Sequence, residues 1–334
     1  MEISLQNPNG VSKKFPQFDT GTDASDHFYF KSNNTLITST NTPFYKAIMK
    51  EWKILDKNLP HKSIYVRIYE NRIDLLRAVI VGASGTPYHD GLFFFDFFFP
   101  AEYPNKPPLV RYKSFGFRVD PSFINPNFTG TGKVCLSILN TTWSGPSWQP
   151  NVSTVLQVLV SIQGLVLNED PSIFMTITYD YYWSKKYSDN VFALSCQTMI
   201  QLLRRPPLDF EEFVVEHFRD RGRCILTACK AYMNGYVRVG KYQDCESLVC
   251  DRKVKVSTTF LSLMTQKYSI LFNLFVKNDP SLNDFRVQLN ELMEKTETEY
   301  VEKAKLKEKK LMSRFSGIVK KLFVLNKCVK GNTD

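Results

Sequence analysis

The chain has 334 residues, 43% of them hydrophobic and 14% aromatic, and carries a formal net charge of +10 at neutral pH. This hydrophobic content excludes a disordered chain, and the length is sufficient for one domain with a core plus additional structure. Much of the positive charge lies in residues 303–330. A terminal basic run is typical of a solvated helix face, so we expect no specific binding of nucleic acid.

Residues 1–40 are rich in Asn, Ser, Thr, Lys and Asp and predict a flexible N-terminal segment. Thr42 and Pro43 then predict the start of a helix, which the spacing of apolar residues extends to Leu55. Strand-like stretches follow, and short turns connect them, so we expect a four-stranded antiparallel meander. The predicted strands cover residues 63–69, 75–81, 92–99 and 109–112.

The second half of the chain predicts helices. Residues 115–150 show little periodicity, and a long loop inside a compact domain is usually functional. Helical patterns follow, ending in a C-terminal helical extension with a basic tail. We expect three parts: a flexible segment (1–40), a core (41–215) and the helical extension (216–334). Two predicted helices begin near residues 153 and 209, and three others cover residues 189–203, 258–276 and 284–307.

Cysteine usage and hydropathy indicate the cellular location. There are seven cysteines, an odd number, and the N-terminal residues lack the apolar run of a secretory leader. Together these two features favour a reducing compartment. The longest apolar run, residues 92–99, contains Asp96 and is far shorter than the roughly 20 residues of a membrane-spanning helix. These features predict a cytoplasmic and/or nuclear protein without a transmembrane segment.

Four cysteines form two closely spaced pairs, which raises the question of a zinc site. The first pair lies in a helical pattern, where residues five positions apart do not share a face. We therefore expect no metal site and interpret these residues as buried or half-buried thiols. The pairs are Cys224 with Cys229 and Cys245 with Cys250.

The most informative segment is the loop that contains Cys135. A thiol nucleophile needs access, a thiolate fraction and hydrogen-bond donors directed at the oxyanion that forms on attack. Cys135 follows a glycine-rich approach, where the backbone can come close to an extended peptide. Asn127 lies eight residues upstream, and a loop that folds back could place its amide near the sulfur.

This loop resembles the active-site signature of ubiquitin-conjugating enzymes, in which His-Pro-Asn is followed by a turn containing Gly and then by Ile/Val-Cys-Leu. The spacing from Asn127 to Cys135 is kept, and Trp143 stands eight residues after the cysteine. Residues 99–108 resemble the proline-rich turn of that family, and residues 85–91 its hairpin turn. Residues 156–168 and 204–207 resemble the large hybrid conjugating-enzyme/ligase subgroup of plants and animals.

The resemblance implies an α+β fold, a four-stranded antiparallel meander flanked by helices. It implies that Cys135 is the nucleophile that carries ubiquitin as a glycyl thioester, that Asn127 stabilises the oxyanion, and that Asp170 orients or deprotonates the incoming lysine. The implied partners are ubiquitin, the ubiquitin-activating enzyme and a ubiquitin ligase, and no metal or cofactor is implied. Whether the chain has built-in ligase activity stays open, and its protein substrate is unknown.

Some residues depart from the family pattern. Asn125 replaces the usual His, which is mainly structural, so we expect the loop to be held differently. Asn105 stands where many relatives carry an apolar residue that contacts ligases. Two alternative functions stay open: a non-catalytic ubiquitin-binding scaffold and a carrier of another ubiquitin-like modifier. Loss of the cysteine would mark the scaffold class, and Cys135 is present.

Overall fold

The computed structural model describes residues 14–32, 42–114, 120–142, 145–169, 181–242 and 254–287, together with residues 290, 291, 294 and 298. The chain divides into two units, residues 1–282 and 283–334, and everything below concerns the first. Each helix in the described ranges is either too short or too polar to span a bilayer.

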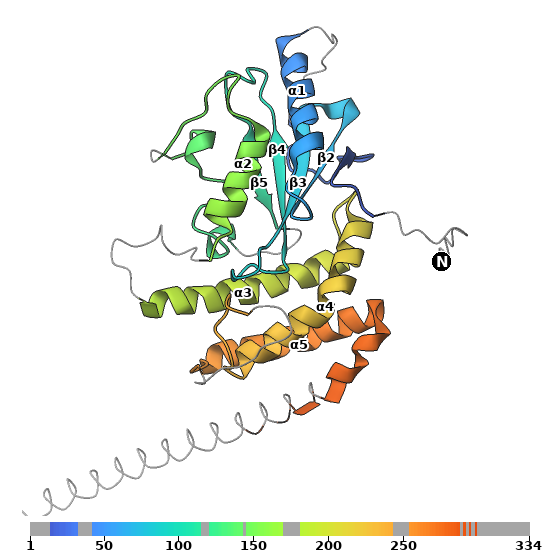
Figure 1. Cartoon of the computed structure of the whole chain (residues 1–334), viewed down its shortest axis with the longest axis vertical. Helices are drawn as coiled ribbons and strands as arrows, with labels where there is room; N and C mark the ends of the chain where they lie inside the picture. The colour runs from blue at the N-terminus through green and yellow to red at the C-terminus, as the bar shows by residue number, and fades with distance from the viewer. Residues whose placement is uncertain are drawn as a thin grey trace, which may run out of the picture. The chain divides into compact units, whose positions relative to one another are not determined.

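A five-stranded mixed sheet forms the centre of this unit (Figure 1). The strands lie side by side in chain order: β1 (Phe18–Thr20), β2 (Ile64–Ile68), β3 (Leu75–Val81), β4 (Leu92–Phe98) and β5 (Leu109–Lys113). Strands β2 to β5 pair antiparallel, which confirms the predicted meander. The additional strand β1 pairs parallel to β2 and was not predicted.

One face of the sheet packs against two helices, α1 (Pro43–Asn58) and α2 (Val155–Ser161). Alternate residues of β4 (Phe93, Phe95 and Phe97) are fully buried in this core, as expected for a pleated strand. The predicted helix start at Thr42 is confirmed, because its hydroxyl oxygen accepts a hydrogen bond from Tyr45 N at 3.1 Å.

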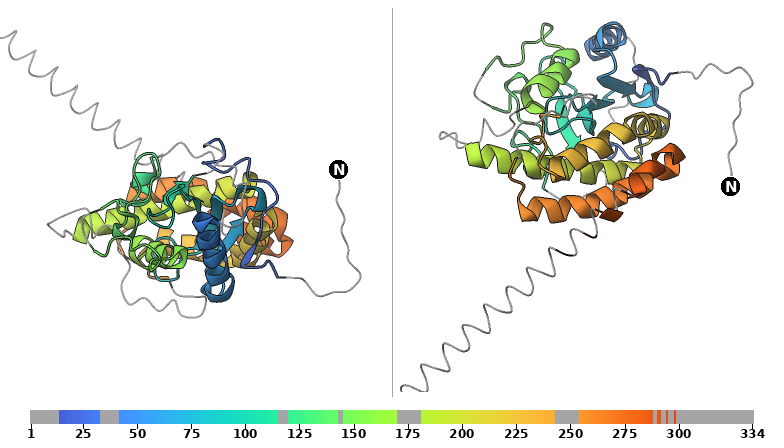
Figure 2. Two further views of the ribbon diagram at one scale, coloured as in Figure 1. Left: turned by 90° about the horizontal axis from the view of Figure 1, so that it is seen from above. Right: turned by 60° about the horizontal axis from the view of Figure 1, so that its bottom comes forward.

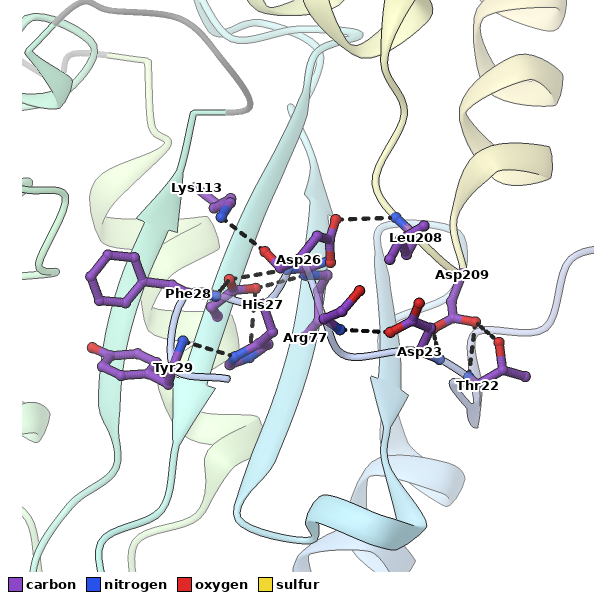
Figure 3. A network of polar contacts seen from close by, with 12 residues as sticks. Thr22, Asp23, Asp26, His27, Phe28, Tyr29, Arg77, Lys113, Leu208 and Asp209 are labelled. Carbon is purple, nitrogen blue, oxygen red and sulfur yellow. Dashed lines mark hydrogen bonds and ion pairs between the residues drawn. The ribbon is translucent and has the colours of Figure 1, made fainter. Parts of the chain in front are cut away.

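The opposite face of the sheet carries a buried ion pair that Asp26, His27 and Phe28 contact (Figure 3). Arg77 of β3 donates from Nε to Asp96 Oδ1 of β4 at 2.7 Å, and both side chains are fully buried. Asp26 also binds the Arg77 guanidinium, and the backbone N–H of Phe28 donates to Asp96 Oδ2 at 2.7 Å. These bonds compensate charges that would be costly if buried alone.

Residues 14–32 therefore differ from the expected flexible segment. A second anchor joins them to the connection at residues 205–210, where the Asp209 carboxylate accepts from the backbone N–H and the hydroxyl of Thr22 at 2.9 and 2.7 Å. The polar composition of the segment suggested flexibility, but its acidic and aromatic residues contact partners that are distant in sequence. This is why composition alone did not reveal the docking.

Three long helices pack together below the sheet: α3 (Tyr181–Arg204), α4 (Glu211–Met233) and α5 (Thr258–Asn278) (Figures 1 and 2). The predicted boundary at residue 216 lies inside α4. On α4, His217 Nε2 lies 2.9 Å from Asp90 O, and Arg221 Nε donates to Asp90 Oδ1 at 2.6 Å. Asp90 belongs to the β3–β4 turn, so these bonds connect α4 to the sheet. The division into a core and a helical extension stays a prediction.

Short helical turns complete the described fold. One of them, η4, is a π-helical turn that continues α2 directly. The turns are η1 (Glu70–Arg72), η2 (Pro121–Phe123), η3 (Ser137–Leu139), η4 (Ile162–Val166) and η5 (Pro280–Asp284).

Candidate active site

The segment before Cys135 is attached to the edge of the sheet. Tyr112 N donates to Gly132 O at 2.8 Å, and Val134 N donates to Val110 O at 3.0 Å. Gly132 has a φ of +87°, and a Cβ at this position would lie 2.6 Å from Tyr112 O. Glycine is therefore required here both by the left-handed backbone and by the close approach to β5. This pairing fixes the backbone directly before Cys135.

The structure brings Asn127 and Cys135 together through two hydrogen bonds. The backbone N–H of Cys135 donates to Asn127 O at 2.7 Å, and the Asn127 side-chain Nδ2 donates to Cys135 O at 3.0 Å. Both residues are half-buried. A primary amide carries two N–H groups, and this contact uses one of them. The arrangement can supply a second amide donor next to a half-exposed thiol.

The residues after Cys135 are held by hydrogen bonds that the sequence did not predict. Thr141 Oγ1 accepts from Leu136 N at 2.7 Å and donates to Leu136 O at 2.9 Å. Trp148 is buried, and its Nε1 donates to Pro104 O at 2.7 Å in the proline-rich turn. The loop is thus anchored on both sides of the cysteine, while Trp143 lies outside the described residues.

Asn125 occupies the position of the usual His and is completely buried. Its Nδ2 donates to Tyr88 Oη at 2.8 Å and to Val166 O at 2.7 Å, and its Oδ1 accepts from Asn127 N at 2.8 Å. The Tyr88 hydroxyl in turn donates to Ile124 O at 2.8 Å, and burial raises its pKa well above the ordinary value. These bonds hold the loop at the position where the family usually carries His, and the consequence of this replacement stays a prediction.

The third predicted residue, Asp170, lies outside the described residues, so its role stays a prediction. The chain before it is described. Asn168 Nδ2 donates to Leu165 O at 3.0 Å, and Glu169 forms an ion pair with Lys241. Both side chains of that ion pair are largely exposed, so we expect it to contribute little to stability.

Asn105 and the lysines of helix α1 lie on the surface of the protein. Asn105, in the turn where relatives carry a ligase-contact residue, is exposed. The lysines on α1 (Lys46, Lys50 and Lys53) are also exposed, which leaves them available to an acidic partner.

The described cysteines other than Cys135 lie in the helical layer. Cys196 and Cys229 are fully buried, and the hydrogen bond between their side chains, together with burial, raises the pKa of the Cys229 thiol. Within the described residues, no three His, Cys, Asp or Glu side chains are grouped as metal ligands would be. Cys245 and Cys250 lie outside these residues.

Comparisons with known proteins identify relatives of the whole fold. The family model described as "Ubiquitin-conjugating enzyme" matches residues 47–193. The Arabidopsis thaliana protein named probable ubiquitin-conjugating enzyme E2 25 is 51% identical over 237 residues, which is 68% of this chain and 37% of the relative. Putative ubiquitin-conjugating enzyme E2 38 of the same organism is 46% identical over 280 residues, which is 79% of this chain and 83% of the relative.

A human protein named dual E2 ubiquitin-conjugating enzyme/E3 ubiquitin-protein ligase BIRC6 is 34% identical over 203 residues, which is 56% of this chain and 4% of that protein. The chain spans 25 to 37% of the length of three of its Arabidopsis relatives. The family model, the high identity over most of E2 38 and the α+β fold agree with one another. The chain therefore belongs to the ubiquitin-conjugating enzyme (E2) family.

Proposed function

We propose that this chain carries ubiquitin as a glycyl thioester on Cys135 and transfers it to a lysine side chain. One observation carries the proposal: the half-exposed Cys135 is bound through two hydrogen bonds to Asn127, whose amide nitrogen lies 3.0 Å from the cysteine's own carbonyl oxygen. The proposal assigns Cys135 as the nucleophile and Asn127 as the donor for the oxyanion, the two groups that thiol-based acyl transfer needs.

In the loading step, the Cys135 thiolate attacks the C-terminal glycyl carbonyl of ubiquitin, which the activating enzyme presents as a thioester. A new carbon–sulfur bond forms, and the bond to the activating enzyme's sulfur breaks, releasing that sulfur as a thiolate. The acyl group arrives already activated, so this chain needs no metal and no bound ATP for the exchange. We propose the exposed lysines of α1 as a contact surface for the activating enzyme.

In the transfer step, a neutral lysine amine attacks the same carbonyl, and negative charge develops on its oxygen. The second N–H of the Asn127 amide would donate to this oxyanion, an effect worth about 3 kcal/mol where such donors have been removed from other enzymes. Asp170 would accept the proton of the incoming amine or orient it. The Cys135 sulfur then leaves as a thiolate, and an isopeptide bond remains.

Ligase activity within the same chain is a second candidate. Asn105 is exposed and polar where relatives carry an apolar ligase contact, and BIRC6 is named as a dual E2/E3 enzyme. Transfer of ubiquitin from this chain to a protein substrate in the absence of any added ligase would support this candidate. We place the activity in the cytoplasm or nucleus, where thiols stay reduced.

The test is a loading assay with the full chain, activating enzyme, ubiquitin and ATP, read on a non-reducing gel. We expect a band shifted by one ubiquitin that disappears with thiol reductant. Cys224→Ser is the matched control, because Cys224 is another half-buried thiol but lies on α4. No band from the folded chain would favour the ubiquitin-binding scaffold, and a band only with another modifier would reassign the cargo.

A further inference from the structure

We propose that a basic and aromatic surface beside Cys135 binds an acidic segment of the protein substrate, next to its acceptor lysine. We call this surface the acceptor patch, and its residues are Phe28, Leu109, Arg111 and Lys133. The inference rests on the proposed function, because it names the class of substrate that the same site would take.

The first argument is the direction of the side chains in the hairpin that carries Cys135. The backbone N–H of Thr129 donates to Lys133 O at 2.9 Å, so the two strands of the hairpin are paired here. Phe128 and Val134 form an antiparallel bridge, and both are buried in the core. Lys133 is exposed and Cys135 is half-buried. Because side chains alternate along a strand, Lys133 and Cys135 project from the same face, about 7 Å apart along the chain.

The second argument is a pair of like charges. Lys133 forms an antiparallel bridge with Arg111 of β5, and residues that lie directly opposite share a face, with their Cβ atoms about 5 Å apart. Among the side chains that the structure describes, neither cation forms an ion pair, and Arg111 Nε is buried without a hydrogen-bond partner. Opposed like charges destabilise a sheet, and a bound carboxylate would relieve this repulsion. The charges therefore favour an acidic ligand.

The third argument is the aromatic side chain on the arginine. The guanidinium carbon of Arg111 lies 3.7 Å from the centroid of the Phe28 ring. Phe28 is 45% exposed, and its backbone N–H is fixed by the hydrogen bond to Asp96 (Figure 3). Leu109, two residues before Arg111 on the same face of β5, is 44% exposed. An arginine stacked on an aromatic ring beside exposed apolar area is typical of the anchor residues of protein interfaces.

The fourth argument is the continuity of the patch with the nucleophile. An extended chain advances about 3.3 Å per residue, so a carboxylate two or three residues from the acceptor lysine can lie over Lys133 and Arg111 while that lysine meets Cys135. A protein substrate brings the lysine and the carboxylates in one segment, and its apolar side chains would cover Phe28 and Leu109. The acceptor patch thus fits a substrate segment in which the lysine is flanked by acidic residues.

The test measures single-turnover discharge of ubiquitin from the preloaded full chain into three synthetic peptides. Each is a Gly-Ser segment with one lysine, and the residues two and three positions from it are both Glu, both Gln or both Arg. We expect the Glu peptide to react about 5-fold faster than the Gln peptide at low ionic strength, and the Arg peptide to be slowest, because each exposed ion pair changes an equilibrium by about 1.4- to 5-fold. Salt at about 0.5 M should remove most of this preference by screening.

Variants of the two cations assign the preference to the patch. Lys133→Gln should lower the ratio of the Glu-peptide rate to the Gln-peptide rate to about 2, and adding Arg111→Gln should bring it close to 1. If the double variant does not fold, Lys133→Glu alone decides, because it cancels the charge of Arg111 and should also bring the ratio close to 1. Lys277→Gln is the matched control, since Lys277 is an exposed lysine on α5.

The ratio separates recognition from general damage, because both peptides react with the same preloaded protein. A lower stability or a slower nucleophile changes both rates alike and leaves the ratio at the parent value. A ratio near 1 in the parent, or a parent-like ratio in the variants of Lys133 and Arg111, would overturn the proposal.

The apolar part of the patch is tested with a Glu peptide that also carries one Trp. We expect the Trp to lower the half-saturating peptide concentration about 3-fold with the parent and to have no effect with Phe28→Ala. An equal gain in both proteins would overturn the assignment of Phe28 to the patch.

The two proposals fail in different ways. A parent chain that loads and then discharges equally into all three peptides refutes this inference alone. A folded parent chain that never loads refutes the proposed function, and this inference with it.

Discussion

Replacing Asn127 with alanine should separate the two halves of the proposed reaction. In the structure Asn127 Nδ2 donates one hydrogen bond, to Cys135 O at 3.0 Å, and the proposal assigns the second N–H of this amide to the oxyanion. Losing the visible bond should cost about 1 kcal/mol of folding stability, which is too little to unfold a domain. Losing the oxyanion donor should raise the barrier to transfer by about 3 kcal/mol, a slowing on the order of 100-fold.

The assay is a single-turnover discharge of the preloaded Asn127→Ala enzyme into free lysine, with the thioester band followed over time. Thermal melts of parent and variant measure the small stability loss separately. We expect a loaded thioester that persists long after the parent has discharged. If the preloaded variant discharged at the parent rate, Asn127 would have no part in the mechanism, and the reasoning from its contact with Cys135 would be wrong.

Three further changes test other parts of the structure. Cys135→Ser should give either an oxygen-linked ubiquitin adduct that resists thiol reductant or no adduct, read on reducing and non-reducing gels. Gly132→Ala should lower the unfolding free energy by about 2 kcal/mol in urea melts, because its φ is +87° and a Cβ would meet Tyr112 O at 2.6 Å. Asp96→Asn should cost about 3 kcal/mol in the same melts, because it removes the buried counter-charge of Arg77.

Each of these changes has its own control or contradicting result. For glycine the control is Gly164→Ala, since a Cβ there meets nothing within 4 Å and should be tolerated. A Gly132→Ala protein as stable as the parent would contradict the strain argument. A thiol-sensitive adduct on the Cys135→Ser protein would show that a different cysteine is loaded.

For Asp96 the test is the pH dependence of stability. Burial raises the pKa of the Asp96 carboxyl, but the Arg77 guanidinium, with help from His27 and the Phe28 N–H, lowers it further, so the net pKa is below the ordinary value. Because the pKa of Asp96 is lower in the folded state than in the unfolded state, its carboxylate stabilises the folded protein fully at pH values above the unfolded-state pKa of about 3.9. This stabilisation is lost as the pH falls from there through the folded-state pKa. We expect the stability difference between parent and Asp96→Asn to narrow below about pH 4, and a constant difference would contradict the account.

Sequence reasoning predicted those parts of the fold that depend on neighbouring residues. The strand-like stretches at residues 63–69, 75–81 and 92–99 and the cap at Thr42 are local signals, and the structure confirms the strands and the helix start. The spacing within one loop suggested that the Asn127 amide could lie near the Cys135 sulfur, and in the structure this amide donates to the Cys135 carbonyl oxygen at 3.0 Å. The chemical roles of these residues and of Asp170 stay predictions.

What sequence reasoning missed depends on partners that are distant in the chain. Asn125 was recognised as a departure, but its partners Tyr88 and Val166 lie 37 and 41 residues away, and no local pattern connects them. Strand β1 was missed for the same reason, because it pairs with the distant strand β2, where Phe18 lies opposite Val66. Composition described the segment as polar, whereas its carboxylates complete a buried network.

The most direct measurement is a mass-spectrometric map of the loaded chain. The full chain would be incubated with activating enzyme, ubiquitin and ATP, and the thioester-linked residue identified by peptide mapping under non-reducing, mildly acidic conditions. The account predicts one ubiquitin linked to Cys135, absent from Cys135→Ala and present on Cys224→Ser. A folded chain that gains no ubiquitin, or that carries it on a different residue, would contradict the account.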